Sequence, residues 1–191
     1  EQLIYIINHA NDKILIIDLD LVPIIEKIIL DCPNVEKLVI LCSKADLPST
    51  KFSEVISYEE LLSMGSENFE WIKGEETDAC GICYTSGTTG NPKGVVYTHR
   101  SNTLHALTQA APDMLNLSST DTIMPVVPLF HANGWSIAYT APLVGSSIVF
   151  PGGDLSPSSL YDMLERGVTI TAAVPTAVSY THLTLPTTLS V

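Results

Sequence analysis

The chain has 191 residues, of which 46% are hydrophobic, so it is long and apolar enough to form one domain with a sizeable core. Its 21 Asp and Glu exceed its 9 Lys and Arg and give a net charge of -12, which opposes binding to nucleic acids and to anionic membrane surfaces. Charged residues interrupt the most apolar stretch, so we expect no transmembrane helix and a cytoplasmic protein.

The first elements along the chain are predicted to alternate between strand and helix. A β-branched run at 14–17 predicts a strand, and apolar spacing at 22–30 predicts a helix that tolerates Pro23 in its first turn. A second strand is expected at 38–41, followed by a loop at 43–53. Ser57 is expected to cap a short helix at 58–62, and a polar surface connection follows at 65–76.

The second half continues the alternation, which predicts an α/β fold with mixed, largely parallel sheets layered with helices. Two strands are expected to flank a polar loop at 85–94. The expected strands are 81–84, 95–97, 122–126, 147–150 and 169–174. The expected helices are 99–115 and 158–166, the latter capped by Ser156 or Ser158, and 134–143 is expected to form a helix or a helical turn.

The two ends of the chain carry expectations of their own. The chain begins with Glu1 rather than Met, and we expect a native start upstream. The pattern of the preceding residues stops at Val178, where the string VSYTHLTLPT begins. This string resembles the translation of a transposase sequencing adapter, so we expect 1–177 to be one part of a domain and 178–191 to be non-native; the alternative is an irregular native terminus.

The four cysteines are too few for a disulfide scaffold in a chain of this length, and we expect free thiols. Cys80 and Cys83 form a C-x-x-C pair, but no second pair with zinc-like spacing follows. Because they lie in an apolar, strand-like run, we expect buried core positions rather than metal ligands.

The loop YTSGTTGNPKG at 84–94 has the composition of a phosphate-binding site. Its glycines allow backbone N–H groups to point at anionic oxygens, its hydroxyls add donors, and Lys93 supplies a mobile positive charge. The sequence lacks the G-K-[S/T] ending of a P-loop ATPase. The alternative is a flexible linker, but linkers do not usually lie between two apolar strands.

A second group of residues, PLFHANGW at 128–135, places His131 beside aromatic side chains. A His can donate a hydrogen bond to a carboxylate and orient it for attack, and Trp135 would share its face if the segment were helical. Taken without the loop, a core His and a core Trp would be the more common explanation. We assign no chemistry to His99, His105 or the pairs Glu59-Glu60 and Glu75-Glu76, for which the sequence shows no partner.

The loop resembles the signature [S/T]-S-G-T-T-G-x-P-K-G of the adenylate-forming superfamily of acyl-CoA synthetases, luciferases and peptide-synthetase adenylation domains. PLFHANGW and the segments at 7–10, 97–101 and 141–145 resemble the medium- and long-chain acyl-CoA synthetases, a subgroup that includes methylthiopropionate-CoA ligases. The resemblance covers about residues 1–177 and implies an incomplete fragment of the large N-terminal adenylating domain.

The resemblance also implies roles for individual residues. It assigns the β- and γ-phosphates of ATP to a set of loop residues, namely Thr85, Ser86, Gly87, Thr88, Thr89, Gly90 and Lys93. It makes the Thr85 hydroxyl a ligand of Mg²⁺. It makes Lys93 and His131 catalytic residues, and it makes His131, Gly134 and Trp135 substrate-binding residues.

The implied reaction converts a fatty acid and ATP to acyl-AMP and then, with CoA, to acyl-CoA. Relatives with this pocket often resemble dimers, which makes a homodimer one option, and the sequence leaves the oligomeric state open. Because the family's later motifs are not found in the sequence, we expect the 191-residue chain alone to be inactive. The alternatives are a luciferase-like enzyme or peptide-synthetase adenylation domain, and a non-catalytic nucleotide-binding module.

Overall fold

The computed structural model describes residues 1–85 and 90–174, without the side chains of Ala132 and Asn133. These residues form two compact units. The first unit combines Glu1–Lys73 with Tyr84–Val95, and the second combines Gly74–Cys83 with the chain from Val96 onward. Within the described ranges, no helix is both long and apolar enough to cross a membrane.

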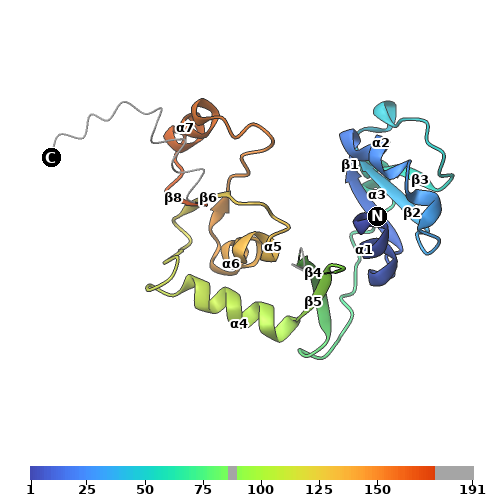
Figure 1. Cartoon of the computed structure of the whole chain (residues 1–191). Coiled ribbons are helices and arrows are strands. Elements are labelled where there is room, and N and C mark those ends of the chain that lie inside the picture. Colours follow the sequence, from blue (N-terminus) through green and yellow to red (C-terminus); the bar gives the residue numbers. More distant parts are fainter. Residues whose placement is uncertain (86–89, 175–191) are drawn as a thin grey trace. The chain divides into compact units, whose positions relative to one another are not determined.

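The first unit is built on a parallel three-stranded sheet in the order β1-β2-β3 (Figure 1). The strands are β1 Ile14–Asp18, β2 Lys37–Leu41 and β3 Val55–Ser57, which confirms the two strands that the sequence predicted. The helix α1, Gln2–Ala10, buries Ile7 in the core of this unit. The core also contains Ile17, Val22, Ile25, Ile29, Cys32, Val35, Leu38 and Ile40.

The predicted helix at 22–30 is wrong in length. The structure has α2 at Val22–Ile25, with Pro23 in its first turn as expected, and a separate 3-10 turn at Ile29–Asp31. Val22, Ile25 and Ile29 are all buried. The apolar spacing therefore indicates that one face is buried. Two short turns can bury this face as well as a continuous helix can, because packing supplies most of the stability of short helices.

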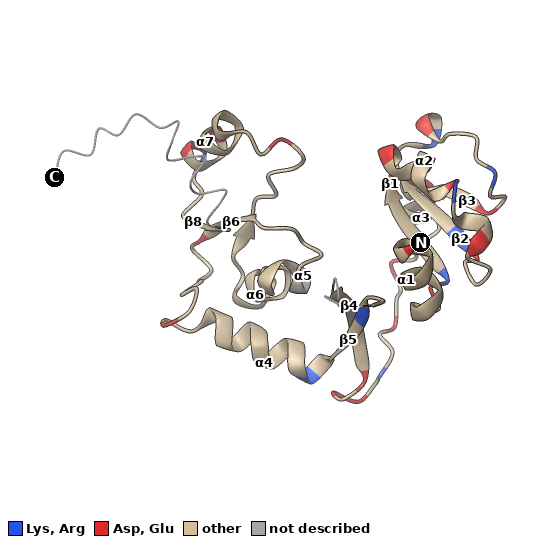
Figure 2. Cartoon of the chain, in the orientation of Figure 1, with Lys and Arg blue, Asp and Glu red and all other residues tan. Residues whose placement is uncertain are grey.

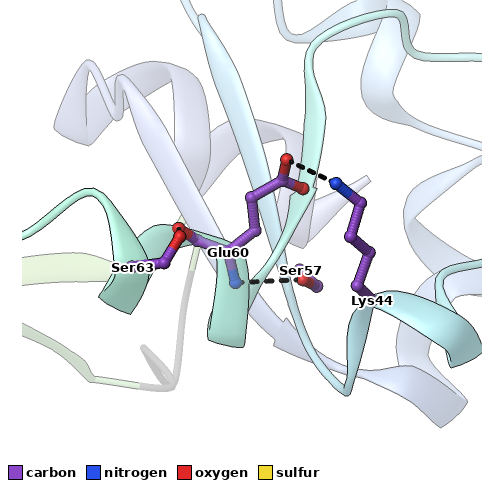
Figure 3. A network of polar contacts seen from close by, with 4 residues as sticks. All are labelled: Lys44, Ser57, Glu60 and Ser63. Atoms are coloured by element: carbon purple, nitrogen blue, oxygen red, sulfur yellow. Dashed lines mark hydrogen bonds and ion pairs between the residues drawn. The ribbon is translucent and has the colours of Figure 1, made fainter.

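Ser57 caps the short helix α3, Tyr58–Ser63, as the sequence predicted. Its fully buried Oγ accepts a hydrogen bond from the amide of Glu60 at 3.1 Å. The Glu60 carboxylate faces Lys44 at 3.4 Å, and Ser63 Oγ donates to the Glu60 carbonyl at 2.7 Å (Figure 3). Glu60, for which the sequence indicated no partner, thus joins the helix start to the preceding loop.

The second unit contains another parallel sheet, with the order β7-β6-β8. Its strands are β6 Thr122–Val126, β7 Ser147–Ile148 and β8 Ile170–Ala173, and its longest helix is α4 His99–Ala110. Side chains alternate across β6, so Ile123 packs with Ile137 and Ala141 of α6 (Ile137–Val144), while Met124 packs with Leu160 of α7 (Pro157–Glu165) (Figure 1). Both faces of β6 are therefore covered, as is usual for a parallel sheet, and the predicted α/β fold is confirmed.

Three predicted elements of this unit differ from the structure. The helix α4 ends at Ala110 rather than 115, because Ala111 precedes Pro112 and adopts an extended conformation. The predicted helix at 134–143 is divided between α5, Ala132–Trp135, and α6. The strand predicted at 147–150 contains two residues. By contrast, Ser156 caps α7 as predicted.

The strands β4, Ala79–Thr85, and β5, Lys93–Thr98, pair as a two-stranded sheet. Cys80 and Cys83 lie in β4, but the expectation that both are buried is wrong, since Cys80 is exposed and Cys83 is half-buried. A two-stranded sheet lacks the neighbouring strands that would enclose its side chains. Cys32, Cys42 and Cys80 are free thiols, as predicted.

Candidate functional site

The candidate phosphate loop begins where β4 ends and finishes where β5 begins, so two strands anchor its two ends. Ser86, Gly87, Thr88 and Thr89 lie outside the described residues. Thr85 and Lys93 lie on either side of this segment, and the structure brings them together, because Thr85 Oγ1 donates a hydrogen bond to the carbonyl of Lys93 at 3.4 Å. Thr85 and Lys93 are both exposed, so a ligand has access to the hydroxyl and to the ammonium group.

Gly90 and Pro92 explain part of the local conformation. Gly90 has a φ of 97°, with open space where a Cβ would lie. This positive φ favours glycine, and it is the type of backbone that turns N–H groups toward an anion. Pro92 is buried, so it anchors the end of the loop beside Lys93.

The Lys93 ammonium gives the loop a positive charge that an anionic ligand can approach. No ion pair of the Lys93 ammonium is found within residues 1–85 and 90–174, although acidic residues are spread over both units (Figure 2). The same ranges contain no group of three His, Cys, Asp or Glu side chains placed to hold a metal ion. The exposed Thr85 hydroxyl is an oxygen donor of the type that Mg²⁺ accepts, and nucleotide phosphates and water commonly supply other ligands of this ion.

The segment of His131, Gly134 and Trp135 forms a tight turn that the sequence did not predict. The amide of His131 donates to the Pro128 carbonyl at 3.0 Å, and the amide of Trp135 donates to the His131 carbonyl at 3.3 Å. His131 precedes α5 and is exposed. The helix α5 begins after His131 and ends at Trp135, so one continuous helix does not carry both side chains. We expected His131 and Trp135 to share a face only if the segment were helical, and that condition is not met.

Three consecutive residues from Gly134 to Ser136 have a left-handed backbone. Their φ values are 62° for Gly134, 55° for Trp135 and 64° for Ser136. A Cβ on Gly134 would lie 2.9 Å from Leu129 Cδ2, so glycine is required there for space as well as conformation. Trp135 and Ser136 hold a conformation that is uncommon for residues with side chains, which is typical of functional segments.

Trp135 and Ser136 differ in how they contact the core of the second unit. Trp135 is half-buried and packs against the cluster around Ile137 and Ala141. Ser136 is 2% exposed, and its Oγ has no hydrogen-bond partner among the described residues. Nothing in the sequence indicated this buried hydroxyl, because serine is ordinarily a surface residue.

An apolar groove of about 500 Å³ lies beside this turn in the second unit. Its walls come from two segments, Pro125 to Phe130 and Phe150 to Leu155. Phe130 is 82% exposed and directly precedes His131. The groove has the size and apolar lining of a small-molecule site, and its proline and aromatic walls suit an aliphatic chain better than a polar one.

The residues to which we assigned no chemistry have structural surroundings instead. Glu76 forms an ion pair with Arg100, and this contact lowers the pKa of the Glu76 carboxyl and raises the pKa of the Arg100 guanidinium. His105 is an exposed residue of α4 that lies 3.4 Å from Gln109. Twenty-four positions separate Glu76 from Arg100, so no local pattern in the sequence could indicate the pair.

Comparison with known proteins identifies the family. The sequence model of the AMP-binding enzymes matches residues 1–187. The chain is 46% identical to a medium-chain-fatty-acid–CoA ligase of Ectopseudomonas oleovorans and 41% identical to a 3-methylmercaptopropionyl-CoA ligase of Ruegeria pomeroyi, each over 92% of this chain. The matched regions cover 32% and 33% of those two proteins, so the chain spans about a third of their length.

Solved structures agree with the fold. A long-chain-fatty-acid–CoA ligase of Archaeoglobus fulgidus superposes with a TM-score of 0.79 and 28% identity, over 95% of this chain and 34% of that one. Both the match of the family model and the identity of the relatives agree with the resemblance read from the loop and from PLFHANGW. The chain belongs to the AMP-binding enzyme family.

Proposed function

We propose that the protein to which this chain belongs activates an aliphatic carboxylic acid with ATP to form acyl-AMP, and then transfers the acyl group to CoA. The proposal rests on one observation above all, the complete signature loop anchored between β4 and β5 with Thr85 and Lys93 exposed at its ends. The names of the similar proteins, which are CoA ligases of medium-chain and methylthio-substituted acids, support the same reaction.

In the proposed first step, the carboxylate attacks the α-phosphorus of ATP, the bond to the bridging oxygen breaks, and pyrophosphate leaves. Negative charge moves onto pyrophosphate, so the protein contributes mainly positioning and charge neutralisation. Lys93 supplies a cation, and the Thr85 hydroxyl supplies an oxygen to Mg²⁺. The residues from Ser86 to Gly90 would add hydrogen-bond donors from hydroxyls and amides.

In the proposed acid site, His131 orients the carboxylate, while Gly134 and Trp135 shape the adjoining wall. Support comes from the tight turn that holds these residues and from the apolar groove that begins beside them. In the second step, the CoA thiol attacks the acyl carbon of acyl-AMP, AMP leaves, and a thioester forms.

The proposal has consequences for the rest of the protein. ATP, Mg²⁺ and CoA are its small-molecule partners, the cytoplasm is its location and a homodimer is its assembly.

Residues 1–177 belong to the N-terminal adenylating domain, and 178–191 are not native to it. Resequencing the source DNA across this region, from a library made without transposase adapters, tests the last statement, because a confirmed tail and stop codon would contradict it.

The activity is tested on the natural-length protein. Exchange of labelled pyrophosphate into ATP that depends on a fatty acid reports the first step, and AMP release that depends on CoA reports the second. Exchange without a CoA-dependent step would favour a luciferase-like enzyme or an adenylation domain. Nucleotide binding without exchange for any acid would favour a non-catalytic module and would overturn the proposal. The 191-residue chain alone is expected to show no turnover.

A further inference from the structure

The end of helix α1 contacts the strand that leads into the candidate phosphate loop. His9 Nδ1 and Tyr84 Oη share a hydrogen bond of 2.6 Å, although 75 positions separate the two residues. Their rings also meet edge to face, with centroids 5.8 Å apart and an interplanar angle of 81°. Both residues belong to the first compact unit, so the contact lies within one body.

Neighbouring residues fix the position of His9. The ring of Tyr5, one helical turn earlier, stacks on the imidazole with centroids 5.2 Å apart. Asn8 Nδ2 donates to the Asp31 carbonyl at 2.9 Å, and Ile7 is buried in the core. The segment Ile7-Asn8-His9 thus attaches the helix end at three points, and His9 is the one that reaches β4.

Tyr84 connects this helix end to the loop. It is the residue before Thr85, with which β4 ends and the candidate loop begins. Burial raises the pKa of the Tyr84 phenol, with smaller contributions from Tyr5 and Asp12, so the hydroxyl stays protonated at neutral pH. The half-buried phenol of Tyr84 is hydrogen-bonded to the His9 ring, which is itself stacked, so the phenol has little freedom to rotate. Thr85 is the next residue along the chain, so its backbone is held by the same contact.

We propose that His9 is a positioning residue which, through Tyr84, holds Thr85 in place for binding of Mg·ATP. The proposal rests on the function proposed above, because it assumes that the loop binds the phosphates of ATP. His9 does not touch the nucleotide in this arrangement. It acts by limiting the motion of the strand end that carries the first oxygen ligand, so its loss weakens Mg·ATP binding without removing any contact to the ligand.

The test compares single and double variants of the 191-residue chain. His9→Ala removes the imidazole, Tyr84→Phe removes only the hydroxyl, and His9→Asn places an amide near the position of Nδ1. Tyr5→Phe and His105→Ala are the matched controls, since neither side chain takes part in the His9–Tyr84 bond. Circular dichroism and thermal unfolding first establish that each variant is folded.

Two readouts separate positioning of the loop from nucleotide binding. The first is the rate of tryptic cleavage after Lys93, relative to cleavage after Lys13 and Lys51, which reports local order at the loop without any nucleotide. The second is the Kd for Mg·ATP, titrated to millimolar concentration. We expect His9→Ala and Tyr84→Phe each to raise the relative cleavage rate and the Kd by about two- to tenfold, the range for one lost hydrogen bond.

The double variant decides whether the two residues act together. We expect the double variant to show the same cleavage rate and Kd as the more strongly affected single variant. We expect His9→Asn to recover most of the wild-type behaviour. Unchanged cleavage and Kd in His9→Ala, or effects that multiply in the double variant, would overturn the proposal. A second outcome separates the two proposals. If the cleavage rates change as expected but the wild-type chain does not bind Mg·ATP, His9 and Tyr84 do hold the end of the loop, and the proposal that the loop binds ATP fails for this chain.

Discussion

Thr98 and Ser101 exchange two hydrogen bonds at the start of α4. The Ser101 amide donates to Thr98 Oγ1 at 3.1 Å, and the Thr98 amide donates to Ser101 Oγ at 2.9 Å. This reciprocal cap satisfies two backbone donors at a helix start, and it links α4 to the last residue of β5.

The cap predicts the effect of Thr98→Ala. The substitution should lower the free energy of unfolding by about 0.5 to 2 kcal/mol, because the Ser101 amide loses its acceptor. Urea denaturation of the chain measures the change. Thr108→Ala is the matched control, since its hydroxyl only bonds back to the Leu104 carbonyl within the helix and alanine is the better helix former. Equal destabilisation by both substitutions would contradict a capping role.

The network around α3 predicts that Ser57 contributes more to stability than Lys44. The Ser57 hydroxyl is fully buried and accepts from the Glu60 amide, so Ser57→Ala should cost about 0.5 to 2 kcal/mol. The Lys44 side chain is 77% exposed, so its pair with Glu60 should contribute less than about 1 kcal/mol. Urea denaturation at two salt concentrations checks both values. A larger loss from Lys44→Ala than from Ser57→Ala would reverse this ranking.

Asp121 predicts a dependence of stability on pH. The Ser118 hydroxyl and amide donate to its carboxylate at 2.7 Å and 2.9 Å, Thr169 Oγ1 donates at 2.9 Å, and these bonds lower the pKa of the carboxyl. A lowered pKa in the folded state stabilises the fold above the unfolded pKa of about 3.9, and this contribution is lost as the pH falls through the folded pKa.

Asp121→Asn should therefore flatten the decline in unfolding free energy between about pH 5 and pH 3, because the variant has no proton to take up at this site. Urea denaturation across that range gives the slope. Asp113→Asn, at an exposed residue for which the described chain shows no side-chain hydrogen bond, is the control and should leave the slope as in the wild type. An unchanged slope in Asp121→Asn would show that the bonds to Ser118 and Thr169 do not favour the ionised form.

Thiol reactivity should differ sharply between Cys80 and Cys32. Cys80 is exposed, whereas Cys32 is 2% exposed and its pKa is raised by burial and by Asp31 and Asp12. Alkylation requires an accessible thiolate, so iodoacetamide should modify Cys80 well before Cys32. Peptide mapping by mass spectrometry at several times measures the order. In denaturant the difference should disappear, and equal rates in the folded chain would contradict the burial of Cys32.

Lys93→Ala in the natural-length protein should reduce pyrophosphate exchange by about 100-fold, because a preorganised group that stabilises charge on the leaving pyrophosphate is lost. Lys51→Ala removes an exposed lysine outside the loop and is the control. Wild-type rates of acyl-adenylate formation in Lys93→Ala would show that this lysine has another role.

The sequence predicted those features that depend on neighbouring residues. The β-branched run of β1, the caps Ser57 and Ser156, and the strand β6 follow from local chemistry, and the loop follows from a specific motif. The break between α5 and α6 could not be predicted, because Trp135 and Ser136 do not ordinarily adopt a left-handed backbone.

Contacts between distant parts of the chain were also beyond the sequence. The exposure of Cys80 depends on which elements cover β4, and the pairs Glu76–Arg100 and His9–Tyr84 join residues 24 and 75 positions apart. For the candidate site, the sequence indicated the residues of the loop and of the turn. Of the apolar groove, it indicated the wall that contains Pro128, Leu129 and Phe130 of PLFHANGW, but not the wall from Phe150 to Leu155, because no local pattern connects the two segments.

The strand orders of the two sheets imply different histories during synthesis on the ribosome. In the order β1-β2-β3, each new strand can join the strand made just before it, so this sheet can grow as the chain emerges. In the order β7-β6-β8, the central strand is made first, and its second edge stays unpaired until β8 has left the exit tunnel. An unpaired edge invites association with other chains, so a ribosome that pauses between β7 and β8 would expose β6 at its most aggregation-prone stage.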